Sequence, residues 1–211
     1  EENRCCTPQT RELAAQLAKQ LGIPFHVLDA QQAFRQEVVQ RFLDGYSRGD
    51  TPNPCVYCNR YLKWDYLWQF AQSIGAEAIA TGHYARLRRG TDGTYELWKG
   101  VDATKDQTYF LSLLTQQHLA HTLFPLGEYT KVEVRQIAHA RQLPAADAPE
   151  SQDLCFLGKR DYRDFLRENA PQAVQPGEIV DRQGKVLGQH NGLAFYTIGQ
   201  RKGMPASAHA L

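Results

Sequence analysis

The sequence predicts an α/β domain with a parallel sheet, followed by a small β-rich unit. Short apolar runs at 25–28 and 78–81 alternate with amphipathic segments, the pattern of strands that are joined by helices. Near Gly158 the composition changes, and glycines and short strand-like runs dominate the rest of the chain. Because 211 residues are enough for one large domain and a smaller one, we expect domains at 1–158 and 159–211.

The first helix is expected to begin at Pro8, because Thr7 is a good N-cap and proline suits the first helical position. Leucines recur every four residues along it, and Gly22 is the expected end. The apolar run 25–28 then predicts a short buried strand.

A second helix is predicted over 31–46, with one apolar face made of Phe34, Val38, Phe42 and Tyr46. After a proline-rich loop, a helix is expected over 57–73 and a second strand over 78–81. The turn residues near Gly93 predict a hairpin between 85–89 and 95–99. Three further helices are expected, at 107–114, 131–141 and 162–168. In the β-rich unit, strands are expected at 177–181 and 185–188.

Composition narrows the class of protein. A hydrophobic content of 42% and a charged content of 22% are ordinary for a globular protein, and the net charge of +1 neither demands nor forbids a nucleic-acid partner. No apolar run is long enough to cross a bilayer. Five irregularly spaced cysteines argue against a secreted disulfide framework, so we expect a cytoplasmic protein without a membrane partner.

The segment TPNPCVYCNR (51–60) carries the strongest chemical signal. Two prolines stiffen a loop that delivers Cys55 and Cys58 to the start of a helix, where backbone N–H groups favour a thiolate. A C-x-x-C pair alone also fits half of a zinc site, a redox pair or a pair of cluster ligands. A third cysteine, Cys155, lies between Leu154 and Phe156 and fits either a buried core thiol or a partner of this pair.

Polar residues at two other places are candidates for ligand contacts. Gly82 and His83 directly follow the strand expected at 78–81, and parallel sheets bind ligands beyond the carboxyl ends of their strands. A polar trio also precedes an apolar helix; it consists of Lys105, Asp106 and Gln107. A cationic stripe formed by Lys159, Arg160, Arg163 and Arg167 fits phosphate contact or an ordinary charged helix equally well.

Taken together, six segments resemble the family of tRNA-specific 2-thiouridylases: TPNPCVYCNR (51–60), ATGHYAR (80–86), KDQTYFL (105–111), FPLG (124–127), SQDLCFLG (151–158) and YTIGQRKG (196–203). The resemblance implies a Rossmann-like adenine-nucleotide α-hydrolase domain of the PP-loop ATPase type. It also implies ATP-dependent 2-thiolation of the wobble uridine in the tRNA anticodon loop, with Mg²⁺ accompanying ATP. The sulfur would come from a persulfide donor or relay protein that a cysteine desulfurase supplies.

Carried over residue by residue, the resemblance implies that Cys155 receives the persulfide and that Cys58 releases the sulfur by forming a disulfide with it. Gly82 matches a position that contacts ATP. The positions that match contacts with tRNA are Asn53, Pro54, Cys55, His83, Lys105, Asp106 and Gln107.

The chain also departs from the family pattern. Some members carry aspartate where this chain has Cys55, so Cys55, Cys58 and Cys155 could instead hold a [4Fe–4S] cluster that carries out the same thiolation. The family's glycine-rich pyrophosphate loop is expected upstream of Glu1, and its terminal β-barrel is expected beyond Leu211. A non-catalytic module that binds tRNA or a metal is the alternative from another class.

Overall fold

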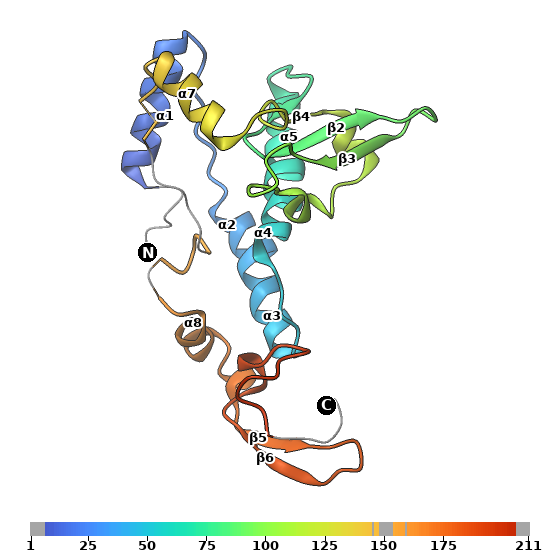
Figure 1. The fold of residues 1–211 in the computed structure, drawn as a ribbon. Coiled ribbons are helices and arrows are strands. Elements are labelled where there is room, and N and C mark those ends of the chain that lie inside the picture. The colour runs from blue at the N-terminus through green and yellow to red at the C-terminus, as the bar shows by residue number, and fades with distance from the viewer. Residues whose placement is uncertain (1–6, 145, 148–153, 159, 206–211) are drawn as a thin grey trace.

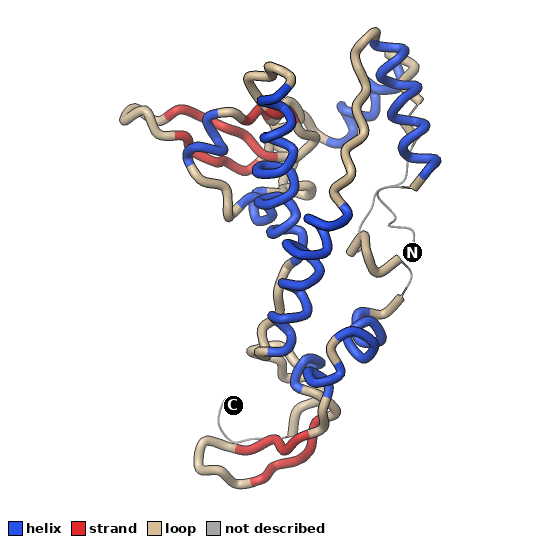
Figure 2. The backbone as a smooth tube through the Cα atoms, turned by 180° about the vertical axis from the view of Figure 1, so that it is seen from behind, coloured by secondary structure: helices blue, strands red, loops and turns tan. Residues whose placement is uncertain are grey.

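The computed structural model describes residues 7–144, 146–147, 154–158 and 160–205. The molecule is elongated (Figure 1), and a long helix over residues 31–47 runs from the upper body toward the hairpin at the other end. Figure 2 shows the same arrangement from behind. Of the three strand pairs among the described residues, the upper body holds two, and the hairpin nearest the C-terminus forms the lower end.

Helix α1 (Pro8–Leu21) forms as the sequence predicts. The Thr7 side chain accepts a hydrogen bond from the Thr10 N–H at 3.2 Å, and Gly22 adopts the left-handed conformation (φ 66°) that ends the helix. In both views α1 lies beside α7 (Lys131–Ala140), another helix that the sequence predicts.

The prediction of a buried strand at 25–28 was wrong. These residues form no strand, and Phe25 and Val27 are 42% and 60% exposed. A strand needs a partner for its backbone N–H and C=O groups, and no strand pairs with 25–28 within the described ranges. An apolar run therefore identifies an extended segment here without ensuring that it joins a sheet.

The helix over 31–47 consists of α2 (Gln31–Phe34), the π-helical segment η1 (Arg35–Gln40) and α3 (Arg41–Ser47). A second continuous helix consists of α4 (Pro54–Tyr57), the π-helical segment η2 (Cys58–Tyr66) and α5 (Leu67–Ser73). The sequence predicted both helices but not their π-helical parts, and the second helix begins three residues earlier than expected. The two helices pack on each other, with the Arg41 guanidinium 4.5 Å from the Tyr61 ring centroid.

Three pairs of strands form within the described residues. Strand β1 (Ile79–Ala80) is parallel to β4 (Thr122–Leu123), which confirms a parallel pairing at the predicted second strand. Strands β2 (Ala85–Arg89) and β3 (Tyr95–Lys99) form the predicted hairpin, and β5 (Gly177–Val180) pairs with β6 (Val186–His190). The helix expected at 107–114 is only the 3₁₀ turn η3 (Thr108–Leu111), and α6 (Gln116–Ala120) follows it.

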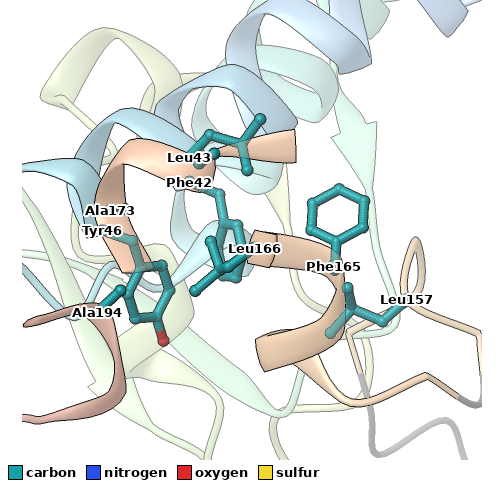
Figure 3. Close-up of a cluster of buried hydrophobic side chains, with 9 residues drawn as sticks. Phe42, Leu43, Tyr46, Leu157, Phe165, Leu166, Ala173 and Ala194 are labelled. Carbon is teal, nitrogen blue, oxygen red and sulfur yellow. The ribbon is translucent and has the colours of Figure 1, made fainter. Parts of the chain in front are cut away.

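Two apolar cores hold these elements together. In the upper body, Trp64 is buried with Ala85 and Leu111, so the second long helix packs against the hairpin and the η3 turn. The other core joins the first long helix to α8 (Tyr162–Asn169), η4 (Pro171–Val174) and η5 (Leu193–Phe195). Figure 3 shows the side chains of this second core, among them Phe42, Leu43, Leu157, Phe165 and Leu166.

Candidate active site

The C-x-x-C pair occupies the start of the second long helix, as the sequence predicts. The Asn53 side chain accepts a hydrogen bond from the Cys55 N–H at 3.0 Å, and Pro54 occupies the first turn. Cys58 is the first residue of the π-helical segment η2. Both thiols are partly buried, so each lies at the boundary between the protein interior and solvent.

The proline loop before this helix is fixed from two sides. A Cβ atom added at Gly45 of α3 would lie 2.8 Å from Pro52 Cγ, so only glycine lets the loop pack this closely on α3. The Thr51 hydroxyl donates a hydrogen bond to the Thr197 hydroxyl at 3.2 Å. The segment 51–60 is therefore in contact with the segment 196–203, two of the six motifs that the sequence singled out.

Asn59 is a site residue that the sequence analysis missed. Its side chain is 4% exposed, and its Nδ2 donates a hydrogen bond to the Phe110 carbonyl at 3.0 Å. Its Oδ1 atom is buried and has no hydrogen-bond partner within the part of the chain that the structure describes. The sequence signal that could have identified Asn59 is its position directly after Cys58 in a polar stretch. A buried amide requires hydrogen-bond partners, so it joins the cysteine segment to another part of the chain.

The segment 105–111 is also tied to the residues after β1. The Gln107 side-chain oxygen accepts a hydrogen bond from the Tyr84 N–H at 3.0 Å, and the Gln107 N–H donates to the Tyr84 carbonyl at 3.2 Å. The Asp106 carboxylate accepts hydrogen bonds from the Thr108 N–H and hydroxyl. Through Gln107 and Asn59, the structure brings together the motifs at 51–60, 80–86 and 105–111.

His83 is buried beneath this junction. It is 7% exposed and lies between aromatic rings, with its centroid 5.7 Å from that of Trp64 and 6.2 Å from that of Phe124. Burial, together with a smaller effect of the charge of Lys63, lowers the pKa of His83 to about 4. The imidazole is therefore neutral near neutral pH, and Thr81 Oγ1 lies 2.8 Å from its Nδ1. The neighbouring Gly82 is exposed.

Cys155 lies in the turn 154–157, closed by a hydrogen bond from the Leu157 N–H to the Leu154 carbonyl at 3.1 Å. The neighbouring Phe156 ring packs against Phe34 and Phe42 of the first long helix, at 6.1 and 5.3 Å between ring centroids. The helix of Cys58 packs on that same long helix, so one scaffold holds both cysteine segments. Residues 151–153 of the motif, and Cys5 and Cys6, lie outside the described residues.

The arginines in and just before α8 are engaged in ion pairs. Arg160 lies 3.0 Å from Glu168, Arg163 lies 3.9 Å from Asp161, and Arg167 lies 2.6 Å from Asp164. These contacts favour the ordinary charged helix over a stripe reserved for phosphates. The fourth member of that stripe, Lys159, lies outside the described residues.

A cavity of about 340 Å³ adjoins the other side of η2. It is lined in part by Arg60, Trp68 and His118, and its wall holds Asp65 paired to both Arg60 and His118. Burial is the main cause that lowers the pKa of His118, followed by the charge of Arg60. None of the predicted site residues lines this cavity.

Among the described residues, no three His, Cys, Asp or Glu side chains lie together as a group that could hold a metal ion. Cys55, Cys58 and Cys155 therefore do not form a cluster site in this arrangement. None of the helices in the same residues is both long and apolar enough to span a bilayer.

Comparison with known proteins identifies the family. Residues 1–159 match the family model described as tRNA methyl transferase HUP domain, and residues 163–209 match that described as tRNA methyl transferase PRC-barrel domain. These matches confirm the predicted fold class, a Rossmann-like nucleotide-binding domain followed by a small β-rich domain.

Similar proteins carry the name tRNA-specific 2-thiouridylase MnmA. That of Chloroflexus aurantiacus is 48% identical over 203 residues, that of Carboxydothermus hydrogenoformans 50% over 201, and that of Moorella thermoacetica 49% over 204. The matches cover 96%, 95% and 96% of this chain but 56%, 55% and 57% of the relatives, so the chain spans little more than half the length of these curated relatives. The resemblance stated from the motifs is confirmed, and the chain belongs to the family defined by the tRNA methyl transferase HUP domain.

Proposed function

We propose that the protein takes part in the ATP-dependent 2-thiolation of the wobble uridine in the tRNA anticodon loop. The observation that carries the proposal is the convergence of three motifs around the helix of Cys58, through the bonds of Asn59 to Phe110 and of Gln107 to Tyr84. The names of its relatives support the same reaction. We propose that the reaction takes place in the cytoplasm. Its substrate base is accessible, because the wobble base lies in a single-stranded loop from which it can be extruded.

In the proposed reaction, the C2 carbonyl oxygen of the uridine attacks ATP and takes up AMP, and pyrophosphate leaves. The terminal sulfur of a persulfide on Cys155 then attacks C2, and AMP departs with the former carbonyl oxygen. The Cys58 thiolate attacks the inner sulfur of Cys155, which breaks the persulfide S–S bond and leaves C=S on the base. The resulting Cys58–Cys155 disulfide needs an external thiol reductant before the next turnover.

Gly82 is the residue of this chain that we propose contacts the nucleotide. Its Cβ position is 3.7 Å from Leu126 Cδ1, an ordinary contact, so the fold itself does not demand glycine there. An exposed glycine after a parallel strand suits close approach of a phosphate or ribose. We expect Gly82→Ala to leave the urea midpoint unchanged and to weaken ATP binding by the complete gene product.

The proposed contacts with tRNA divide according to their environment. Asn53 and Gln107 use their side-chain oxygens within the protein, and Pro54 and His83 are buried, so these four shape the surface that receives the base. The partly buried Cys55, together with Lys105 and Asp106, is the group that we propose faces the RNA.

We derive no step through an iron–sulfur cluster, because the cysteines that would hold it do not form a metal-binding group among the described residues. Instead, we propose that the sulfur arrives as a persulfide from a relay protein that a cysteine desulfurase loads. Cys155 lies near the end of the first proposed domain (1–158) and is only partly buried, which supports this route.

The proposal is tested with Cys58→Ser and Cys155→Ser in the complete gene product, with thiolated tRNA resolved on a mercury-containing gel. Both variants should lose thiolation. Ser73→Ala is the control, because it removes a hydroxyl at the far end of the same long helix, outside the proposed site, and should keep thiolation. Full thiolation by Cys155→Ser would refute the persulfide assignment, and loss only on removal of all three cysteines together would favour a different sulfur route.

A further inference from the structure

The β2–β3 hairpin carries a face that the proposed reaction does not use. Figures 1 and 2 both show the hairpin projecting from the upper body with its tip away from other elements. One face packs inward, with Ala85 fully buried in the core and Leu97 against it. Strand alternation places four residues on the opposite face, namely Arg86, Arg88, Glu96 and Trp98; we call this set the outer hairpin face.

Arginine and tryptophan are stacked on the outer hairpin face. The Arg88 guanidinium lies 4.5 Å from the Trp98 ring centroid, and Trp98 remains 43% exposed. Arg86 pairs directly across from Trp98 in the ladder. An exposed indole beside guanidinium groups is a platform on which a nucleobase can stack while phosphates contact the cations.

Two carboxylates also face this platform. Glu96 accepts a hydrogen bond from Trp98 Nε1 at 2.8 Å, and Glu128 lies 3.6 Å from Arg86. The first fixes the plane of the indole ring, which favours stacking. The second joins the exposed Glu128 to Arg86, whose side chain is 22% exposed and also donates a hydrogen bond from Nε to the Lys99 carbonyl at 2.7 Å. Because Glu128 is exposed and contacts only one edge of the guanidinium, a phosphate can compete with it at Arg86.

The hairpin is also placed where the substrate would pass. Strand β2 begins directly after Tyr84, and the chain returns from β3 to the trio at 105–107. Both ends of the hairpin therefore join segments that we propose contact tRNA. A nucleic acid whose base enters the site at one end can extend along the hairpin toward its tip.

We propose that the outer hairpin face binds a single-stranded part of the tRNA substrate, with one base stacked on Trp98 and phosphates at Arg86 and Arg88. This inference rests on the proposed function for the identity of the RNA. An acidic protein partner is the alternative class. RNA is favoured because the cations are stacked on an aromatic ring that itself offers a flat surface for a base.

The test measures binding of an anticodon stem-loop RNA by fluorescence anisotropy at several salt concentrations. Trp98→Ala should weaken binding by about 5- to 100-fold, the range for loss of one stacked base. Arg88→Ala should weaken binding and reduce the slope of log affinity against log salt by about 0.7, whereas Arg88→Lys should keep the slope. Arg11→Ala on α1, remote from the hairpin in Figure 1, is the matched control and should bind like the wild type.

Tryptophan fluorescence provides a second readout. Trp64 is 1% exposed and Trp68 is partly buried against His121, so Trp98 is the most exposed of the three tryptophans. RNA should quench the fluorescence of the wild type more than that of Trp98→Phe, and the difference between them reports contact with Trp98. If Trp98→Ala and Arg88→Ala bind the RNA with the same affinity as the wild type, the inference is overturned. Unchanged RNA binding combined with loss of sulfur uptake from the donor would also overturn it, in favour of a protein partner. If the wild type binds RNA through this face but never thiolates it, the proposed function fails and the inference about the hairpin stands.

Discussion

Replacement of His83 by glutamine should remove much of the acid sensitivity of folding. Burial between Trp64 and Phe124 lowers the pKa of His83 from 6.5 to about 4. In the unfolded chain the imidazole regains its ordinary pKa, so the unfolded state binds the proton at a higher pH than the folded state does. The stabilisation from neutral His83 is therefore complete above about pH 6.5 and is lost as the pH falls toward 4.

The magnitude follows from proton linkage. With a pKa of 6.5 in the unfolded state and about 4 in the folded state, the free energy of unfolding falls by about 2 kcal/mol between about pH 7 and about pH 5. Glutamine does not titrate, and its amide can replace the ring nitrogen that lies 2.8 Å from Thr81 Oγ1. Between the same two pH values, the free energy of unfolding of His83→Gln should therefore fall by about 2 kcal/mol less than that of the wild type.

The assay is urea unfolding at a series of pH values, followed by tryptophan fluorescence, to which the buried Trp64 beside His83 contributes. Asn169→Ala is the control, because it removes a hydrogen bond to the Phe165 carbonyl on α8 and no titratable group. The decline of its stability as the pH falls should match that of the wild type. An equal loss of stability in the wild type and in His83→Gln would refute the reasoning, since His83 would then bind its proton equally well in both states.

Three further changes test local features of the structure. Gly45→Ala should destabilise the fold by about 1–3 kcal/mol, because the added Cβ meets Pro52 at 2.8 Å; the urea midpoint measures this, and an unchanged midpoint would show that the loop moves freely. Asn59→Ala should cost about 1–3 kcal/mol and slow thiolation, whereas Asn169→Ala, which removes a similar amide-to-carbonyl bond on α8, should cost stability but leave the thiolation rate of the folded protein unchanged. Thr130→Ala removes a capping box at α7 and should cost about 1 kcal/mol, and thermal unfolding that is identical to wild type would contradict this.

The sequence predicts those elements whose signals are local. Helix α1 has an N-cap, a proline in its first turn and a glycine at its end, and all three act within a few residues. The second long helix was also predicted, although it begins at Pro54 rather than at the expected Tyr57. The β2–β3 hairpin likewise depends on short-range turn chemistry. For the same reason, the C-x-x-C pair could be placed at a helix start before the structure was known.

The parts that could not be predicted depend on contacts between distant segments. The run 25–28 has strand-like residues, but pairing requires a neighbour that local sequence does not specify. The burial of His83 results from Trp64 and Phe124, which belong to other elements. The role of Asn59 depends on a carbonyl 51 residues away. Local periodicity contains no information about such partners, and so the site was predicted as separate motifs.

The most direct test of the sulfur relay is mass spectrometry of the complete gene product after a single turnover with ATP, tRNA and a persulfide donor. Before tRNA is added, the peptide of Cys155 should carry one additional sulfur atom. After turnover, that sulfur should be on the uridine, and a disulfide should join Cys58 to Cys155. Thiolated tRNA formed without any persulfide on Cys155, or without a disulfide in the absence of reductant, would contradict the account.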